Sequence, residues 1–253
     1  DEVVVKFCRY PISPLNRSHE KRIQRFRHEV KALKRALISP QSNSVVSIVG
    51  VGRISLQSAY KKDKTVYEVA YYAMEKAEDL ESYTERSSLS DREKLELFVE
   101  LAESLSSLHS LGIRHRDLKP DNILIKDGRI KLGDLGLIQD INRDYSIDQP
   151  TEKIGPFGYM SPEAMNKAFA DHSRIQDMET IVICEKSDHY QLGLILFYLM
   201  QGEIPMGCLL EEDFSGGWKP YDELIQSVKS LLQFRKTRRS SLESLIGNLH
   251  AIS

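Results

Sequence analysis

Few cysteines and no long hydrophobic segment occur in this sequence, and each shortage excludes a class of protein. The three cysteines, Cys8, Cys184 and Cys208, are far apart and form no CxxC pair. Neither a disulfide framework nor a zinc site is therefore indicated, and a reducing cytoplasm is the expected compartment. The longest apolar run covers residues 192–200, far short of the roughly 20 residues that a membrane-spanning helix needs. We expect no membrane partner.

An excess of basic charge is missing as well. Lysine and arginine number 35 against 37 aspartates and glutamates, for a formal net charge of -2. Since nucleic-acid-binding domains gather basic residues on one face, no nucleic acid is expected as a partner. The 253 residues, 41% of them hydrophobic and 28% charged, fit one two-lobed domain or two small ones. The sequence has no initiator methionine, so we expect further residues upstream of Asp1.

The first part of the chain has the pattern of a small sheet with one helix. Residues 3–7, VVVKF, predict a buried strand that carries a single buried lysine, Lys6. Residues 45–56 and 65–74 predict two more strands on either side of a polar turn. Between these strands and the first, apolar residues recur at steps of three and four and predict one buried helix face: Ile23, Phe26, Val30, Leu33 and Leu37.

The second part is predicted to be mainly helical. Ser90 and Glu93 form a capping box that starts a helix. Two short apolar strands flank the turn signal Asp127-Gly128 and predict a hairpin, and a long irregular stretch is expected from Asp134 to about Glu163. The fold class is therefore α+β. Further helices are predicted over residues 188–200, 221–232 and 241–249.

The segment HRDLKPDN, residues 115–122, is followed by the predicted hairpin and then by DLG, residues 134–136. Phosphoryl transfer needs a carboxylate beside the acceptor hydroxyl, metal ligands near the phosphates and a cation on the transferring group. These motifs resemble the catalytic loop and magnesium loop of the eukaryotic-type (Hanks-type) protein kinase family. The resemblance implies ATP and Mg2+ as cofactors, with these catalytic residues: Asp117, Lys119, Asn122 and Asp134, of which Asn122 and Asp134 hold the metal.

The resemblance implies a two-lobed protein-kinase fold. Residues 1–74 would form a small sheet-plus-helix N-lobe, and residues 75–253 a mainly helical C-lobe with the catalytic loop and activation segment. The two strands and glycine-rich turn that should precede Lys6 are not in this sequence, and Gly50 and Gly52 come too late to replace them. The N-lobe is thus expected to be truncated before its third strand.

The nucleotide-binding residues of the family also have counterparts in the expected order. Lys6 corresponds to the strand lysine that holds the α- and β-phosphates, and Glu29 to the helix glutamate that pairs with it. Taken alone, Lys6 would more often be a charged residue that protects a strand edge than a ligand, and the order of the motifs favours the ligand. The resemblance places the remaining adenine-site residues at Val4, Met74, Glu75, Ala77 and Leu124, with Val4 in place of the usual alanine.

Other motifs of the family are structural. Ser161-Pro162-Glu163 resembles the Ala-Pro-Glu motif, and Arg239 resembles the late arginine that pairs with its glutamate. Asp188 resembles the aspartate that braces the catalytic-loop backbone, and Tyr190 replaces the usual tryptophan. Leu33, His115 and Leu135 would stack as a hydrophobic spine. The chain is longer than the family between Glu163 and Asp188, and its substrate-docking helix after Pro205 is abbreviated.

Two signals for the acceptor disagree. Lys119 within DLKPDN is typical of serine/threonine kinases, whereas Pro156 stands where tyrosine kinases generally have proline. Because Lys119 contacts the transferring phosphate directly, it carries more weight and favours a serine or threonine hydroxyl of a protein substrate. The run QLGLILFYLMQGEIP, after Asp188, resembles stand-alone bacterial kinases.

Arg116 resembles the arginine of kinases whose activation segment is ordered by phosphorylation. Candidate sites of autophosphorylation are Thr151, Ser146 and Tyr145. Alternatively, Arg116 orders the loop through the unmodified carboxylates of Asp148 or Glu152. The two readings are evenly balanced.

Two other functions remain open. A pseudokinase that binds or scaffolds without transferring phosphate is suggested by the missing glycine-rich turn and by Val4. A small-molecule phosphotransferase of the aminoglycoside type shares the aspartate and asparagine chemistry. Those enzymes generally lack a Ser-Pro-Glu segment after a long activation loop, so its presence here favours a protein acceptor.

Overall fold

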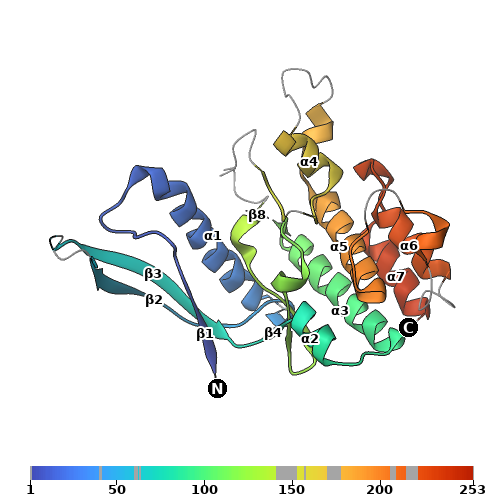
Figure 1. Cartoon of the computed structure of the whole chain (residues 1–253), viewed down its shortest axis with the longest axis horizontal. Helices are drawn as coiled ribbons and strands as arrows, with labels where there is room; N and C mark the ends of the chain where they lie inside the picture. The colour runs from blue at the N-terminus through green and yellow to red at the C-terminus, as the bar shows by residue number, and fades with distance from the viewer. Residues whose placement is uncertain are drawn as a thin grey trace.

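The computed structural model describes residues 2–39, 42–59, 62, 64–140, 153–156, 158–169, 178–205, 209–214 and 222–252. It is a mixed α+β structure in which a small N-terminal sheet and its helix lie on one side, and a group of helices lies on the other (Figure 1). This agrees with the predicted fold class. Within the described parts of the chain, no helix is long and apolar enough to cross a membrane.

The N-terminal sheet has three antiparallel strands in the order β1-β3-β2. Its strands are β1 (Val3–Phe7), β2 (Ile48–Gln57) and β3 (Val66–Glu75). The predicted helix is α1 (Glu20–Leu37), and its buried face includes the expected Ile23, Phe26 and Leu33. The glutamate Glu29 is buried on this same face.

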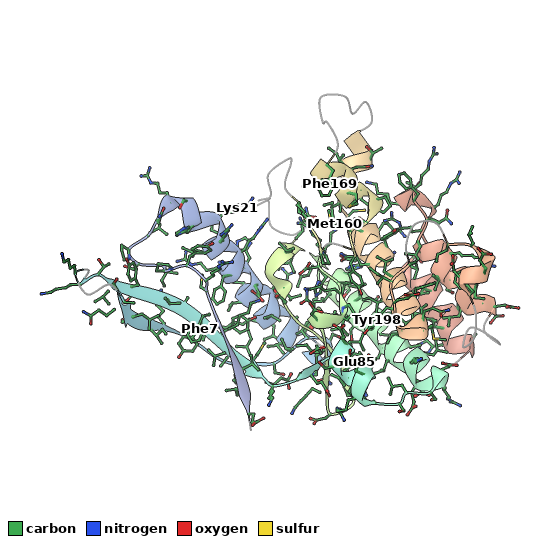
Figure 2. All side chains as sticks on the ribbon, viewed as in Figure 1. Phe7, Lys21, Glu85, Met160, Phe169 and Tyr198 are labelled. Carbon is green, nitrogen blue, oxygen red and sulfur yellow. The ribbon has the colours of Figure 1, made fainter. Side chains whose placement is uncertain are left out.

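The prediction that β1 is buried is wrong. Val3, Val4, Val5 and Phe7 are 49%, 38%, 42% and 48% exposed, and the Lys6 side chain is 31% exposed. The reason is its position: β1 is an edge strand that pairs only with β3, so little covers its outer side, where Phe7 lies (Figure 2). β-Branched composition reports fit to a pleated surface, and it does not report whether that surface is covered.

The part of the chain after the N-terminal sheet is mainly helical, as predicted. α3 (Asp91–Ser110) begins with the expected capping box of Ser90 and Glu93. α5 (Glu185–Gln201) is buried along most of its length and contacts both α3 and α6, while α3 also contacts α7. The other helices are α2 (Leu80–Arg86), α4 (Pro162–Phe169), α6 (Asp222–Leu231) and α7 (Leu242–Ile252).

Two small sheets place the loops that carry the motifs. β4 (Glu78–Asp79), β6 (Ile123–Lys126) and β7 (Arg129–Leu132) form one of them, and β5 (Ile113–Arg114) pairs with β8 (Gln139–Asp140) in the other. The β6–β7 hairpin turns at Asp127 and Gly128, which both have positive φ, as the turn signal predicts. The hairpin brings its two ends together: the Gly133 amide donates to the Asn122 carbonyl at 2.9 Å.

The predicted irregular stretch after Asp134 contains only short elements in its described parts. These are the 3-10 helix η4 (Leu135–Leu137) and β8, and α4 then starts at Pro162. After Pro205, the described residues up to α6 contain one 3-10 turn, η7 (Glu211–Asp213). Residues 206–208 and 215–221 of this region lie outside the described residues, so the abbreviated docking helix stays a prediction.

Candidate active site

The catalytic-loop backbone is held by a carboxylate from the first turn of α5. Asp188, which is 0% exposed, accepts from the amides of His115 at 2.9 Å and Arg116 at 2.7 Å. Arg116 has a positive φ of 68°, a conformation that non-glycine residues seldom adopt. His109 Nε2 contacts the same carboxylate at 2.7 Å. Although burial acts in the opposite direction, His109 and the loop amides keep the pKa of Asp188 below its usual value.

Asp117 and Asn122 lie against each other within this loop. Asn122 Nδ2 donates to the Asp117 carbonyl at 2.7 Å and to its Oδ2 at 2.9 Å. Asn122 is the last residue of the 3-10 helix η3 (Pro120–Asn122), and this turn brings its side chain back to Asp117, five residues earlier in the sequence. Burial, and then the nearby negative charge of Asp134, raise the pKa of Asp117 to about 6. A carboxylate with this pKa is a stronger base than an ordinary aspartate and is still ionised at neutral pH.

Asp134 is positioned by the turn that follows β7. Its φ of 44° is in the left-handed region, and its Oδ1 accepts from the Gly136 amide at 3.3 Å. A Cβ at position 136 would come within 3.0 Å of this carboxylate oxygen, which explains the glycine. Partial burial opposes ionisation, but Lys6 and the Gly136 amide hold the pKa of Asp134 below its usual value.

Lys6 joins two carboxylates that lie far apart in the sequence. Its Nζ lies 2.7 Å from Glu29 Oε1 and 2.8 Å from Asp134 Oδ1. The predicted pairing of Lys6 with Glu29 is therefore present. Burial works against the charge on Lys6, yet the two carboxylates raise its pKa above the usual value. Glu29 is only 2% exposed, and burial raises its pKa in spite of the lysine.

Lys119 does not contact Asp117 through a hydrogen bond. Its Nζ instead pairs with Asp121 Oδ2 at 2.6 Å, and the Lys119 side chain is 29% exposed. The motif predicts that this lysine contacts the transferring phosphate, which requires it to leave Asp121. The pair joins a partly exposed lysine to an exposed aspartate, and surface pairs contribute little stability, so the lysine can change partners at small cost.

The expected metal ligands have the right chemistry for a hard cation. Asp134 supplies an ionised and partly exposed carboxylate, and both bonds of Asn122 use Nδ2, so they leave its amide oxygen uncommitted. Mg2+ prefers such oxygen ligands and commonly retains water. Among the described residues, no group of three His, Cys, Asp or Glu side chains could hold a metal by itself.

The residues expected around adenine lie on β1, at the end of β3, just before β4 and on β6. Val4 and Met74 are directly paired in the β1–β3 ladder, and a Cβ at position 133 would come within 2.8 Å of a Leu124 methyl carbon, which would have to shift. The Glu75 side chain accepts from the Ser47 amide at 2.8 Å, which fixes the strand end just before Ala77. Of these five positions, the structure joins Val4 to Met74 by strand pairing.

The three predicted spine residues, Leu33, His115 and Leu135, are each 0% exposed. Leu33 and Leu135 belong to one hydrophobic cluster. His115 Nε2 lies 3.1 Å from the Gly133 carbonyl, and its Nδ1 accepts from the Asp117 amide at 3.3 Å. Burial lowers the pKa of His115, so the neutral ring carries its proton on Nε2. That the three side chains stack on one another stays a prediction.

The predicted pair of Glu163 and Arg239 is present and buried. The guanidinium binds the carboxylate at two points, 2.7 Å and 2.9 Å, and the residues are 4% and 3% exposed. Ser187 Oγ also donates to Glu163 at 2.6 Å. Burial opposes ionisation, but Arg239 and Ser187 hold the pKa of Glu163 below its usual value. Tyr190, which replaces the usual tryptophan, lies under the guanidinium at 4.9 Å.

Two residues that the motifs do not predict also hold the site. Gln191, one turn after Asp188, accepts from the Leu118 amide at 3.1 Å and donates to the Tyr159 carbonyl at 3.2 Å. The three-residue spacing on one helix face was the available signal. Tyr72 donates to Glu29 at 2.8 Å, and its only signal was a polar group on the same strand face as Met74.

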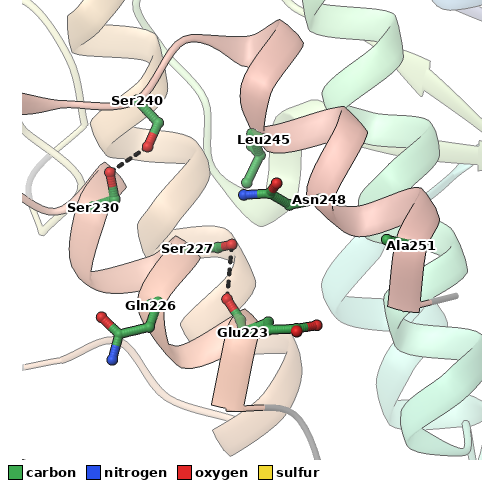
Figure 3. A pocket seen from close by; sticks show the side chains of 8 residues that line it. All are labelled: Glu223, Gln226, Ser227, Ser230, Ser240, Leu245, Asn248 and Ala251. Carbon is green, nitrogen blue, oxygen red and sulfur yellow. Dashed lines mark hydrogen bonds between the residues drawn. The ribbon is translucent and has the colours of Figure 1, made fainter.

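The proposed phosphorylation sites Tyr145, Ser146 and Thr151 lie outside the described residues, as do Asp148 and Glu152. A separate polar cavity of about 510 Å³ lies between α6 and α7 (Figure 3). Its lining includes Ser227, Ser230 and Asn248 and none of the catalytic-motif residues. The serine hydroxyls there are already bonded, Ser227 to the Glu223 carbonyl and Ser230 to Ser240.

Comparison with known proteins places these residues in a family context. The chain is 29% identical over 208 residues to serine/threonine-protein kinase PrkC of Bacillus subtilis, covering 81% of this chain and 27% of that protein. It is 33% identical over 122 residues to probable serine/threonine-protein kinase PknB of Lactococcus lactis, covering 48% and 17%. Over 137 residues it is 30% identical to dual specificity protein kinase TTK of mouse, covering 53% and 16%.

The chain thus spans well under a third of the length of each of these relatives. The family model described as the protein kinase domain matches residues 12–249. Lys6 precedes the matched segment, so its assignment rests on its contacts with Glu29 and Asp134. A match over nearly the whole chain, together with the geometry of its motifs, shows that this chain belongs to the protein kinase family.

Proposed function

We propose that this chain transfers the γ-phosphate of ATP to serine or threonine hydroxyls of a protein substrate. The observation that carries the proposal is the convergence of two clusters, Lys6 with Glu29 and Asp134, and Asp117 with Asn122. Residues 1–74 and 75–253 would form the two lobes, with the nucleotide between them. ATP is the phosphate donor that membership of the family implies.

Asp117 is the proposed acid–base residue. Its raised pKa, about 6, suits a group that orients the acceptor hydroxyl and takes up its proton as the phosphoryl group moves. Asn122 fixes the rotamer of Asp117 through the bond to Oδ2. Lys119 would leave Asp121 and neutralise charge on the transferring group, a step that its partly exposed position allows.

The nucleotide would be held by residues from both parts of the chain. Lys6, kept in place by Glu29, would bind the α- and β-phosphates. Asp134 and Asn122 would hold Mg2+, which neutralises phosphate charge when bound. Lys6 currently bonds to Asp134, so it exchanges this carboxylate for phosphate oxygens on binding. The adenine would lie among Val4, Met74, Leu124 and the backbone of Glu75 and Ala77.

The acceptor class follows from Lys119 and from the relatives. PrkC and PknB are named serine/threonine-protein kinases, and Lys119 is typical of such enzymes. Pro156 and the likeness to TTK, named a dual specificity kinase, make tyrosine the alternative acceptor. Autophosphorylation at Thr151, Ser146 or Tyr145, read by Arg116, would regulate the enzyme.

A pseudokinase is the second candidate, and one contact favours it. Lys6 occupies an oxygen of Asp134, the residue that should hold the metal, and a protein that keeps this pair closed would bind no magnesium nucleotide. The two candidates therefore differ in whether nucleotide and metal can separate Lys6 from Asp134.

The proposal is tested by incubating the full natural protein with labelled ATP. Generic serine/threonine and tyrosine peptides are offered as acceptors. We expect label on serine or threonine after acid hydrolysis, and at least about 100-fold less label when Asp117→Asn protein replaces the wild type. Label on tyrosine alone would correct the acceptor class. No label on any acceptor or on the protein itself, with or without binding of magnesium-ATP, would replace the proposal with the pseudokinase.

A further inference from the structure

Glu29 receives two hydrogen bonds on the same oxygen. Lys6 Nζ lies 2.7 Å and Tyr72 Oη 2.8 Å from Glu29 Oε1. Tyr72 is 0% exposed and Glu29 is 2% exposed. Burial and the nearby carboxylate raise the pKa of Tyr72 far above its usual value, so the phenol keeps its proton and acts as the donor.

The strand register explains why both donors reach one carboxylate. Lys6 and Tyr72 are directly opposite each other in the β1–β3 ladder, and side chains of directly paired residues lie on the same face with about 5 Å between their Cβ atoms. That face meets α1, where Phe26, one turn before Glu29, packs on the Tyr72 ring at 5.6 Å. Tyr72 thus attaches α1 to the central strand of the sheet by a ring contact and a hydrogen bond.

The two donors differ in how strongly they are committed to Glu29. Lys6 divides its charge between Glu29 and Asp134, and its side chain is 31% exposed. Tyr72 has one proton, fully buried and given to Glu29 alone. When Lys6 moves toward another anion, Glu29 therefore keeps a donor. Without Tyr72, a buried carboxylate would lose part of its solvation at that moment, and such a loss is costly.

We propose that Tyr72 is a positioning residue, whose hydroxyl holds Glu29 and with it helix α1 against the sheet independently of Lys6. Lys6 is then able to exchange Asp134 for the phosphates of ATP while α1 stays in place. The inference rests on the proposed phosphotransfer for its catalytic readout, and on the fold alone for its structural readout.

Tyr72→Phe removes the hydroxyl and keeps the ring, and Tyr71→Phe is the matched control. Tyr71 is the neighbouring residue on β3, on the opposite face, where its ring packs on Phe7 at 5.8 Å. Both variants are made in the full natural protein, alone and together with Glu29→Gln. We measure kcat, KM for magnesium-ATP, KM for the acceptor peptide, and hydrogen exchange of α1 and α5 amides without nucleotide.

Tyr72→Phe is expected to lower kcat/KM for magnesium-ATP about 10-fold, the lower end for losing a hydrogen bond to a charged group. KM for the acceptor should not change. Hydrogen exchange of the α1 amides should be about 10-fold faster in Tyr72→Phe, with exchange of the α5 amides unchanged. Tyr71→Phe should change kcat/KM for magnesium-ATP and the α1 exchange rate by less than about 2-fold. In the Glu29→Gln background, Tyr72→Phe should lower kcat/KM for magnesium-ATP much less, because the charged acceptor of the hydrogen bond is already lost.

Equal behaviour of Tyr72→Phe and Tyr71→Phe, or a Tyr72→Phe effect that is undiminished in Glu29→Gln, overturns the inference. A wild-type protein that transfers no phosphate refutes the proposed function but leaves the exchange experiment able to decide. Faster exchange confined to α1 in Tyr72→Phe then still supports the role of Tyr72, and unchanged exchange refutes it.

Discussion

Two carboxylate–cation pairs connect distant parts of this chain, and they are built in opposite ways. Lys6–Glu29 and Arg239–Glu163 have the same shortest distance, 2.7 Å. The Lys6 side chain is 31% exposed and shared with Asp134, whereas the Arg239 side chain is 0% exposed. Arg239 also donates to the backbone carbonyls of Gln233, Phe234 and Lys186.

The difference shows that an ion pair can either stabilise the fold or allow a side chain to exchange one binding partner for another. The acceptors around Arg239 are the buried Glu163 carboxylate and three backbone carbonyls, so its planar guanidinium fits one arrangement only. Lys6 is a flexible point charge between two carboxylates, one of them partly exposed, and it can change partners without leaving a buried charge unpaired. We therefore expect loss of Arg239 to affect folding and changes around Lys6 to affect nucleotide chemistry.

The largest expected effect is on the buried pair. Arg239→Ala leaves Glu163 buried without its partner and should lower the free energy of unfolding by about 3–5 kcal/mol. Arg235→Ala, at an exposed arginine of the same segment, is the control and should change it by less than about 0.5 kcal/mol. Chemical denaturation measures both. Wild-type stability of Arg239→Ala would show that the buried pair is no more structural than the exposed one.

The second effect separates catalysis from folding. Asp117→Asn should reduce phosphotransfer about 100-fold or more without lowering stability at neutral pH. The pKa of Asp117 rises on folding from 3.8 to about 6, so its buried charge destabilises the fold increasingly as the pH passes from the lower value to the higher. Asp127→Asn, at the exposed hairpin turn, is the control for rate. A less stable Asp117→Asn with normal activity would reverse both assignments.

The third effect concerns the partner that Lys6 exchanges. Asp134→Asn should weaken magnesium-dependent ATP binding by about 10- to 100-fold, since a charged metal ligand is lost. Binding of ATP in EDTA should change much less, because Lys6 remains paired with Glu29. Calorimetric titrations with and without magnesium provide the measurement. An equal loss in both conditions would mean that Asp134 acts on Lys6 and not on the metal.

The smallest expected effect is a pH dependence of the free energy of unfolding, and it arises at a histidine close to the Arg239 pair. His189 Nδ1 donates to the Ser240 carbonyl at 2.9 Å, and burial lowers the pKa of His189 from 6.5 to about 4. The folded state therefore binds fewer protons than the unfolded state between these values, and stability falls as the pH falls. The loss between pH 8 and pH 6 should be about 1 kcal/mol.

His189→Gln can keep a bond to the Ser240 carbonyl and should remove that part of the pH dependence. Denaturation at pH 8 and pH 6 compares the two proteins. His109, which stacks on His189 at 5.7 Å and contacts Asp188, is present in both proteins. A difference between them is therefore assigned to His189. An identical pH dependence in wild type and variant would assign the effect to other groups.

The sequence was sufficient to predict the pairs but not their surroundings. Lys6 with Glu29 and Glu163 with Arg239 were expected from motif order, because each motif is short and its residue types have few alternative uses. The exposure of β1 was predicted wrongly, since burial depends on what lies beside a strand, which local composition does not contain. Tyr72 was not predicted, because its role depends on its strand register with Lys6, which lies 66 positions earlier in the sequence.

The convergence of two loop amides on Asp188 has a consequence for motion. His115 and Arg116 belong to no helix or strand, yet both N–H groups are bonded to a carboxylate of the buried helix α5. On the picosecond-to-nanosecond timescale, these amides should have NMR order parameters near the value of about 0.85 that is typical of rigid backbone. A relaxation measurement would therefore find helix-like rigidity in a segment that has no helical hydrogen bonds, and the proposed base would sit on a loop whose fluctuations are those of the core.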